Sequence, residues 1–227
     1  QGSRVPLAIR WPKGIKNPGR VFSDPVNLSD LAPTFLESAG LEVPGMMTAT
    51  GLQEVIVNKQ GTDRLAAFIA MERHDGCRKG GKGYPSRAIR TKDYMYILNY
   101  TPERWPAGNP DREFCARYIP FGEVDSSPTK TLLMDNKDKP GFKRFYDLAF
   151  AKRPAEELYD LAEDPGQINN LAGKTEYAKV QKELSSQLKQ RLKQTKDPRA
   201  LGLDAPWDYY PYYGAMRNKN WKVDHKP

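Results

Sequence analysis

The stretch from Ala66 to Arg90 has the sequence AAFIAMERHDGCRKGGKGYPSRAIR. An apolar run from Ala66 to Met71 is followed at once by four polar residues at 72–75 and by a basic, glycine-rich loop at 78–83. A second run of strand-forming residues begins at Ser86. Short apolar runs of this kind are typical of buried strands, and ligand sites in α/β proteins often lie just beyond a strand's carboxyl end. The stretch therefore predicts two strands joined by the best candidate for a site.

Further strands are expected after this stretch and near the start of the chain. Residues 86–90 and 94–100 flank the polar turn 91–93, a pattern that predicts a β-hairpin. Arg87 and Arg90 alternate with apolar neighbours, so we expect both on the hairpin surface. Residues 157–161 (ELYDL) predict another strand. Residues 5–12 (VPLAIRWP) predict a short strand with proline at both margins, where proline is tolerated.

Helical patterns are clearest in the second half of the chain. Residues 175–196 carry apolar side chains at three- and four-residue spacing, which predicts a helix with one face docked on a sheet; they are Tyr177, Val180, Leu184, Leu188 and Leu192. A helix is also expected from about residue 30 to Gly40, with an apolar stripe at Leu31, Phe35 and Ala39. Shorter helices are expected around 127–136 and 143–151. The aromatic-rich tail after Pro198 is expected to pack over the body, with stacking on sugars or bases as the alternative.

The composition of the chain limits which partners and which kinds of site it can have. The net charge of +8 favours anionic partners such as nucleic acid, sulfate or phosphate groups, and acidic glycans. No run approaches the roughly 18 apolar residues of a membrane span, and residues 1–4 lack the layout of a signal peptide. Cys77 and Cys115 permit at most one disulfide. The spacing of the two histidines and two cysteines argues against zinc, and the lack of an adjacent aspartate pair argues against calcium or magnesium.

Four segments, in this order and spacing, resemble sulfatases of the alkaline-phosphatase-like superfamily. Residues 2–12 resemble the strand that follows the last metal-binding loop of that family. Residues 30–40 (DLAPTFLESAG) are similar to its D-L-x-P-T-x-L-x-x-x-G helix. Residues 156–172 (EELYDLAEDPGQINNLA) are similar to its E-L-Y-D-L-x-x-D-P-x-E-x-x-N-L-A segment, with Gln167 or Ile168 where an acidic residue is more usual. Residues 72–74 with 83–91 resemble glycan sulfatases near heparan N-sulfatase.

The resemblance implies chemistry whose central residues are missing from this chain. Sulfatases use a formylglycine, made from Cys or Ser in C/S-x-P-x-R, beside a divalent cation. Here Cys77 precedes Arg-Lys-Gly-Gly, Cys115 precedes Ala-Arg-Tyr-Ile, and Ser126-x-Pro128-x-Lys130 has lysine in place of arginine. We therefore expect no catalytic residue, metal ligand or cofactor in this chain. The resemblance implies that formylglycine and calcium, or another divalent cation, belong to a missing N-terminal part.

What the chain could contribute is substrate recognition. His74 is the best candidate, as a hydrogen-bond donor to a sulfate or a sugar hydroxyl. Arg73 and Glu72 could contact sugar hydroxyls or a uronate carboxylate, or pair with each other. Arg4 could face the sulfate pocket, and Arg78, with Lys79 and Lys82, could rim a cleft that attracts a polyanionic glycan. For each residue the alternative is structural: a histidine that holds the loop, a surface pairing partner, or a solvated loop.

The expected fold class is α/β. Residues 1–84 are expected to be the closing part of an alkaline-phosphatase-like sheet domain. Residues 85–227 are expected to form a small antiparallel sheet packed on a C-terminal helix, with long loops.

The expected function is that of the C-terminal fragment of a sulfatase acting on sulfate esters or sulfamates of a sulfated carbohydrate, inactive on its own. Its expected partners are the missing N-terminal part and the carbohydrate, without nucleic acid, in the periplasm, outside the cell or in a lysosome. Two alternatives stay open. One is a fragment of a related phosphatase or phosphodiesterase. The other is a nonenzymatic basic module for glycan or nucleic acid, although no RNP, helix-turn-helix or finger signature is present.

Overall fold

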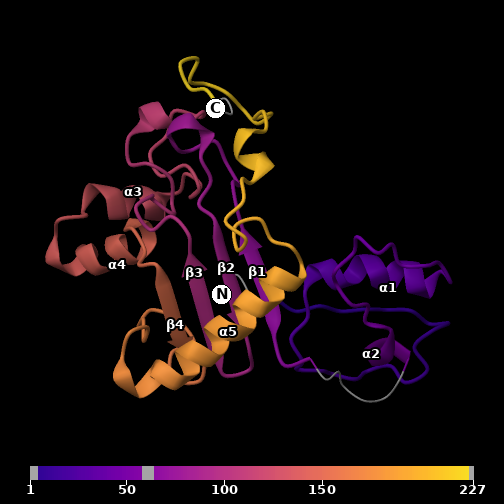
Figure 1. The fold of residues 1–227 in the computed structure, drawn as a ribbon. Helices are drawn as coiled ribbons and strands as arrows, with labels where there is room; N and C mark the ends of the chain where they lie inside the picture. The colour runs from indigo at the N-terminus through magenta and orange to yellow at the C-terminus, as the bar shows by residue number, and fades with distance from the viewer. Residues whose placement is uncertain (1–4, 58–63, 225–227) are drawn as a thin grey trace.

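A four-stranded antiparallel sheet forms the centre of the computed structural model, which describes residues 5–57 and 64–224. The strands lie side by side in chain order (Figure 1): β1 (Ala67–Met71), β2 (Ser86–Arg90), β3 (Tyr94–Asn99) and β4 (Glu156–Asp160). The predicted hairpin is confirmed as β2 and β3, and the strands predicted at 66–71 and 157–161 are confirmed as β1 and β4.

The register of the sheet aligns its largest apolar side chains. Ile89 lies opposite Tyr96 on the neighbouring strand, and Tyr96 lies opposite Leu158 on the next. Directly opposed residues of antiparallel strands point to the same face. These three residues therefore form a continuous apolar row across β2, β3 and β4, and all three are fully buried.

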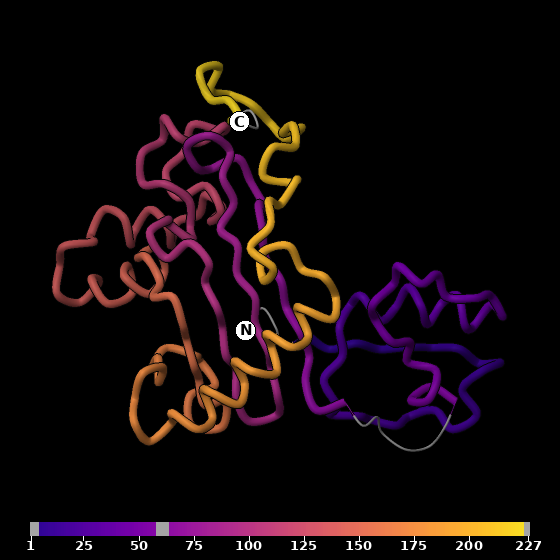
Figure 2. Tube along the Cα trace, viewed as in Figure 1, coloured from indigo at the N-terminus to yellow at the C-terminus, as the bar shows by residue number. Residues whose placement is uncertain are grey.

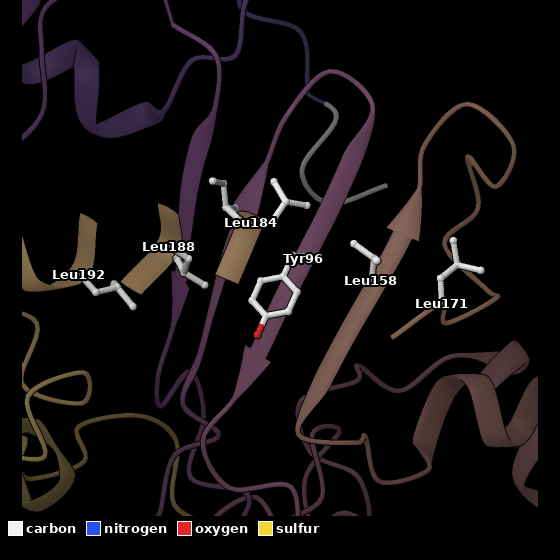
Figure 3. Close-up of a cluster of buried hydrophobic side chains, with 7 residues drawn as sticks. Tyr96, Leu158, Leu171, Leu184, Leu188 and Leu192 are labelled. Atoms are coloured by element: carbon white, nitrogen blue, oxygen red, sulfur yellow. The ribbon is translucent and has the colours of Figure 1, made fainter. Parts of the chain in front are cut away.

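Helix α5 (Ala178–Gln194) covers this row, as its periodicity predicts. Figure 1 shows α5 crossing the face of the sheet, and Figure 3 shows its leucines pointing toward Tyr96 and Leu158. The resulting core cluster consists of Ile89, Tyr96, Leu158, Leu171, Leu184, Leu188 and Leu192. The apolar stripe of the sequence is thus the face that fixes the helix to the sheet.

Leu188 lies at the middle of this contact and is 1% exposed. Replacing Leu188 with alanine is expected to lower the free energy of unfolding by about 3 kcal/mol, because it removes buried apolar area and leaves a cavity. Urea denaturation followed by circular dichroism measures this change. The matched control is Lys189→Ala, which alters the exposed neighbour on the same helix and should cost less than about 0.5 kcal/mol. Similar losses for the two variants would contradict the packing described.

A second, smaller core lies beside the sheet. Helices α3 (Pro128–Asp135) and α4 (Pro140–Phe150) confirm the short helices predicted in this region. Phe150 of α4 stacks on Phe121, with ring centroids 4.7 Å apart. Buried Lys130 of α3 donates to the backbone carbonyls of residues 120, 121 and 124, which ties the helix to the preceding loop.

The remaining helices are short. The 3-10 helices η2 (Lys79–Gly81), η3 (Arg112–Phe114), η4 (Thr175–Tyr177) and η5 (Pro206–Tyr209) punctuate the loops. In the N-terminal region, η1 (Leu28–Asp30) leads into α1 (Leu31–Ser38), and α2 (Gln53–Val57) follows. Figures 1 and 2 show α1, α2 and their loops as a lobe beside the sheet, on the side of β1.

Two predictions for this lobe are wrong. Residues 5–12 form no strand: none of residues 5–57 is in a strand, so the lobe itself offers no strand with which their backbone groups could pair. Helix α1 exists, but its predicted apolar stripe does not face a core, because Phe35 is 65% exposed while Pro33 and Thr34 are buried. The lobe therefore carries an apolar surface that the described residues leave open.

The α/β class, with a small antiparallel sheet packed on a C-terminal helix, is confirmed. The boundary predicted after residue 84 stays a prediction. Strand β1 precedes it and β2 follows it, and the two pair from Ala67↔Arg90 to Met71↔Ser86. Within the described ranges, no helix has both the length and the apolar character needed to cross a membrane.

Candidate functional site

The loop that follows β1 has a backbone shape that requires glycine. Gly80 and Gly81 have φ angles of 66° and 67°, a left-handed conformation that other residues adopt at a cost. A Cβ on Gly80 would also lie 2.2 Å from a carboxylate oxygen of Asp224. The amide of Asp224 donates to the carbonyl of Gly80 at 3.0 Å, so the end of the chain lies directly against this loop.

The C-terminal tail packs over the loop, which confirms the packing interpretation of its aromatic residues. The Trp221 indole donates to the carbonyl of Arg78 at 3.0 Å, and the Tyr212 hydroxyl donates to the Asp75 carboxylate. Burial and that hydrogen bond raise the pKa of Tyr212 to about 12, which keeps the hydroxyl protonated at neutral pH. In Figure 2 the tail lies at the same end of the sheet as the loop. Tyr213, by contrast, is 91% exposed.

One ring nitrogen of His74 contacts a protein carboxylate, and the rest of the imidazole is exposed. Its Nδ1 lies 2.8 Å from Oε2 of Glu123, while the side chain is 77% exposed. A carboxylate beside Nδ1 selects the tautomer that carries hydrogen there, and this leaves Nε2 for an external group. Nε2 can accept a hydrogen bond from a hydroxyl, or donate one to an anion when both nitrogens are protonated.

Arg78 lies beneath His74 and not at the rim of the loop. It is 2% exposed, and its Nη1 donates to Oε1 of Glu123 at 2.9 Å. Its Nε and Nη2 donate to the carbonyls of Trp105 and Pro106 at 2.8 and 2.7 Å. Because these donors are committed to protein acceptors, the geometry favours Arg78 as the residue that positions Glu123. Its role as a substrate ligand stays a prediction.

Glu72 and Arg73 do not pair with each other. The Glu72 carboxylate accepts from Arg87 at 2.6 Å and from Arg199 at 2.8 Å. Arg73 instead donates from Nη2 to the carbonyl of Tyr210 at 2.8 Å. Its Nη1 is buried and has no hydrogen-bond partner among the described residues. Arg4 lies outside the described residues.

The two lysines of the loop lie near aromatic rings. Lys79 is exposed, with Nζ 5.8 Å from the centroid of the Phe114 ring. Lys82 lies 3.2 Å from the Asp224 carboxylate and 5.3 Å from the centroid of the Tyr209 ring. Lys79 thus adds an exposed positive charge beside the site, whereas the charge of Lys82 is paired with Asp224.

Sequence reasoning missed several residues that build this site. Glu123 orients His74, and Asp75 binds both Arg117 and Tyr212. Glu123, Arg117 and Tyr212 lie far from residues 72–83 in the chain, in segments without regular structure, so no local pattern indicates them. The polar run at 72–75 is the one signal that pointed here.

The described residues do not offer a metal site. Within residues 5–57 and 64–224, no group of three or more His, Cys, Asp or Glu side chains could hold a metal ion. The calcium and formylglycine that the resemblance implies for an N-terminal part stay predictions. The site as built can bind a hydroxyl or an anion at His74, on a surface that carries lysines.

Comparison with known proteins gives consistent matches. The family model described as N-sulphoglucosamine sulphohydrolase, C-terminal, matches residues 1–107. An N-acetylglucosamine-6-O-sulfatase of Bacteroides thetaiotaomicron is 29% identical over 86% of this chain and 26% of that protein. An ulvan-active sulfatase of Formosa agariphila is 28% identical over 81% of this chain and 32% of that protein. The chain thus spans a third or less of these curated relatives.

A solved structure of a protein in complex with its substrate, D-glucosamine-2-N,6-O-disulfate, is also similar. It is 27% identical, with a TM-score of 0.44, over 75% of this chain and 25% of that chain. The family match at residues 1–107 and the curated relatives together confirm the resemblance seen in the sequence. The chain is therefore similar to the C-terminal portion of sulfatases.

Proposed function

We propose that this chain is the C-terminal part of a sulfatase that hydrolyses sulfate esters or sulfamates of a sulfated carbohydrate. In this proposal the chain supplies one wall of the substrate pocket and the scaffold behind it. The observation that carries the proposal is His74, an exposed imidazole whose orientation is fixed by Glu123, which in turn binds the buried Arg78. The relatives named as sulfatases support the reaction class.

His74 is proposed to bind the substrate by hydrogen bonding and not to act as the nucleophile. Its Nε2 would contact a sulfate oxygen or a sugar hydroxyl. A side chain whose orientation is already fixed loses less freedom when a ligand binds. Lys79 and Lys82 would raise the local concentration of a polyanionic glycan, because clefts lined by one sign of charge attract the opposite sign.

The nucleophile and the divalent cation are proposed to belong to an upstream part of the same protein that packs on the N-terminal lobe. Large apolar side chains of this lobe are strongly exposed: Val5 74%, Val21 91%, Leu28 79%, Phe35 65% and Met46 87%. Large apolar side chains exposed in this number are consistent with a lobe that packs against another part of the protein. We place the protein in the periplasm, outside the cell or in a lysosome, as the resemblance implies.

The test is a variant of His74 in the protein that includes the upstream part. With His74→Ala, the KM for sulfate release from an N- or O-sulfated glucosamine is expected to rise about 10- to 100-fold, with a smaller change in kcat. Sulfate is measured by ion chromatography. Lys189→Ala on α5, far from the loop, serves as the matched control and should leave both constants unchanged. Unchanged KM and kcat for His74→Ala would overturn the role of His74.

A second arm of the same experiment tests the reaction class. The unaltered protein is assayed against sugar phosphates of the same sugars. Phosphate release that exceeds sulfate release would identify a phosphatase or phosphodiesterase and contradict the proposed function. If His74→Ala lost both sulfate release and phosphate release, His74 would bind the substrate whichever reaction the protein catalyses. The role of His74 and the reaction class are therefore tested separately.

A further inference from the structure

Two segments far apart in sequence run antiparallel beneath the loop. The carbonyl of Gly76 accepts from the amide of Ala116 at 2.6 Å. A Cβ placed on Gly76 would lie 3.1 Å from that of Ala116, so these residues face each other. The preceding residue Asp75 forms an ion pair with the following residue Arg117. Cys77 follows Gly76 and Cys115 precedes Ala116, so the two cysteines are the next residues of these segments in the other direction.

The two cysteines meet in a buried space. Both are 0% exposed, and both are free thiols in this structure. A Cβ on Gly122 would lie 2.6 Å from Cβ of Cys77 and 2.8 Å from Sγ of Cys115. Both atoms therefore lie within 2.8 Å of one point, so the two side chains are neighbours in the same buried space.

We propose that Cys77 and Cys115 form an intramolecular disulfide when the protein folds in an oxidising compartment. The oxidant is an external disulfide, such as glutathione disulfide or an oxidised thiol–disulfide oxidoreductase. One cysteine thiolate attacks this disulfide and releases a first external thiol. The second cysteine then displaces the other external thiol from the mixed disulfide. One S–S bond forms, the external disulfide is reduced to two thiols, and the two cysteine protons end on those thiols.

The bond would secure the floor of the candidate site. It would close a loop that contains Arg78, β2, β3 and the carbonyls of Trp105 and Pro106 to which Arg78 donates. Burial raises the pKa of the Cys77 thiol, so the reactive thiolate is scarce once the protein has folded. The disulfide is thus expected to form during folding and to resist reducing agents until the protein unfolds.

Peptide mapping tests the bond directly. The protein is exported to the bacterial periplasm, unfolded in the presence of iodoacetamide, digested, and analysed by mass spectrometry with and without prior reduction. We expect a linked peptide pair containing Cys77 and Cys115, and alkylation of both only after reduction. Full alkylation of both residues without reduction would overturn the proposal. Protein made in a reducing cytoplasm provides the dithiol reference.

Thermal unfolding of alanine variants gives an independent measure. If the bond is present, Cys77→Ala, Cys115→Ala and the double variant each remove the same link, and each should lower Tm by about 10 °C. If the Tm loss of the double variant instead equalled the sum of the losses of the two single variants, the cysteines would be two separate buried thiols, and the proposal would be overturned. Neither measurement uses sulfate release, so the disulfide holds or fails independently of the proposed function.

Discussion

Replacing Arg87 with methionine is expected to lower the free energy of unfolding by about 4 kcal/mol, because it removes a buried cation from two partly buried carboxylates, Glu72 and Asp197. Arg87 is 2% exposed on β2, with Nη2 at 2.6 Å from Glu72 and Nε at 2.8 Å from Asp197. Burial alone would lower the pKa of this guanidinium, but hydrogen bonds to Asp197 and Glu72 raise it overall. Arg87 therefore connects Glu72, which directly follows β1, with Asp197, which follows α5.

The measurement is urea denaturation at neutral pH, and the matched control is Lys92→Met. Lys92 lies on the exposed turn of the same hairpin, so removing its charge should change the unfolding free energy by less than about 0.5 kcal/mol. Glu72 also contacts Arg199 at 2.8 Å, so Arg87→Met removes only one of the two arginine partners of Glu72. A loss below about 1 kcal/mol for Arg87→Met would mean that the ion pairs contribute little beyond packing.

The elements with strong local patterns were predictable from the sequence. Helix α5 follows from leucines at 184, 188 and 192, and the β2–β3 hairpin follows from two strand-forming runs around a polar turn. Such patterns succeed because one face of each element is buried against a neighbour of the same domain. The strand predicted at 5–12 was wrong because a local pattern does not show whether a second strand pairs with it. Without such pairing, the backbone groups of a short apolar run are not satisfied as a strand.

The prediction that Arg87 lies on the hairpin surface is wrong, and local pattern could not have corrected it. The alternating pattern indicates that Arg87 lies on the same face of the strand as the residues two positions away. It does not indicate whether distant carboxylates pair with Arg87 and allow it to be buried. Asp197 lies 110 residues further along the chain. Glu123, which orients His74, is likewise 49 residues away in a loop. The sequence therefore located the candidate loop, whereas the partners that fix its side chains depend on tertiary contacts.

Replacing Arg78 with methionine is the second change expected to have a large effect, of about 4 kcal/mol on the free energy of unfolding. The substitution keeps the apolar stem but removes three hydrogen bonds, so two backbone carbonyls and the carboxylate of Glu123 lose their donor. Released from Arg78, Glu123 would no longer hold His74 in one orientation. Urea denaturation measures the stability loss, and ¹⁵N NMR of the His74 ring measures the tautomer.

Lys79→Met is the matched control, because Lys79 is the next cation in the same loop but is exposed. Its removal lowers the charge of the loop equally and should cost less than about 1 kcal/mol, with the His74 tautomer unchanged. If Arg78→Met behaved like Lys79→Met in both measurements, Arg78 would be a peripheral cation. A large loss of stability with an altered His74 ring in Arg78→Met alone would establish that the buried arginine positions the exposed histidine through Glu123.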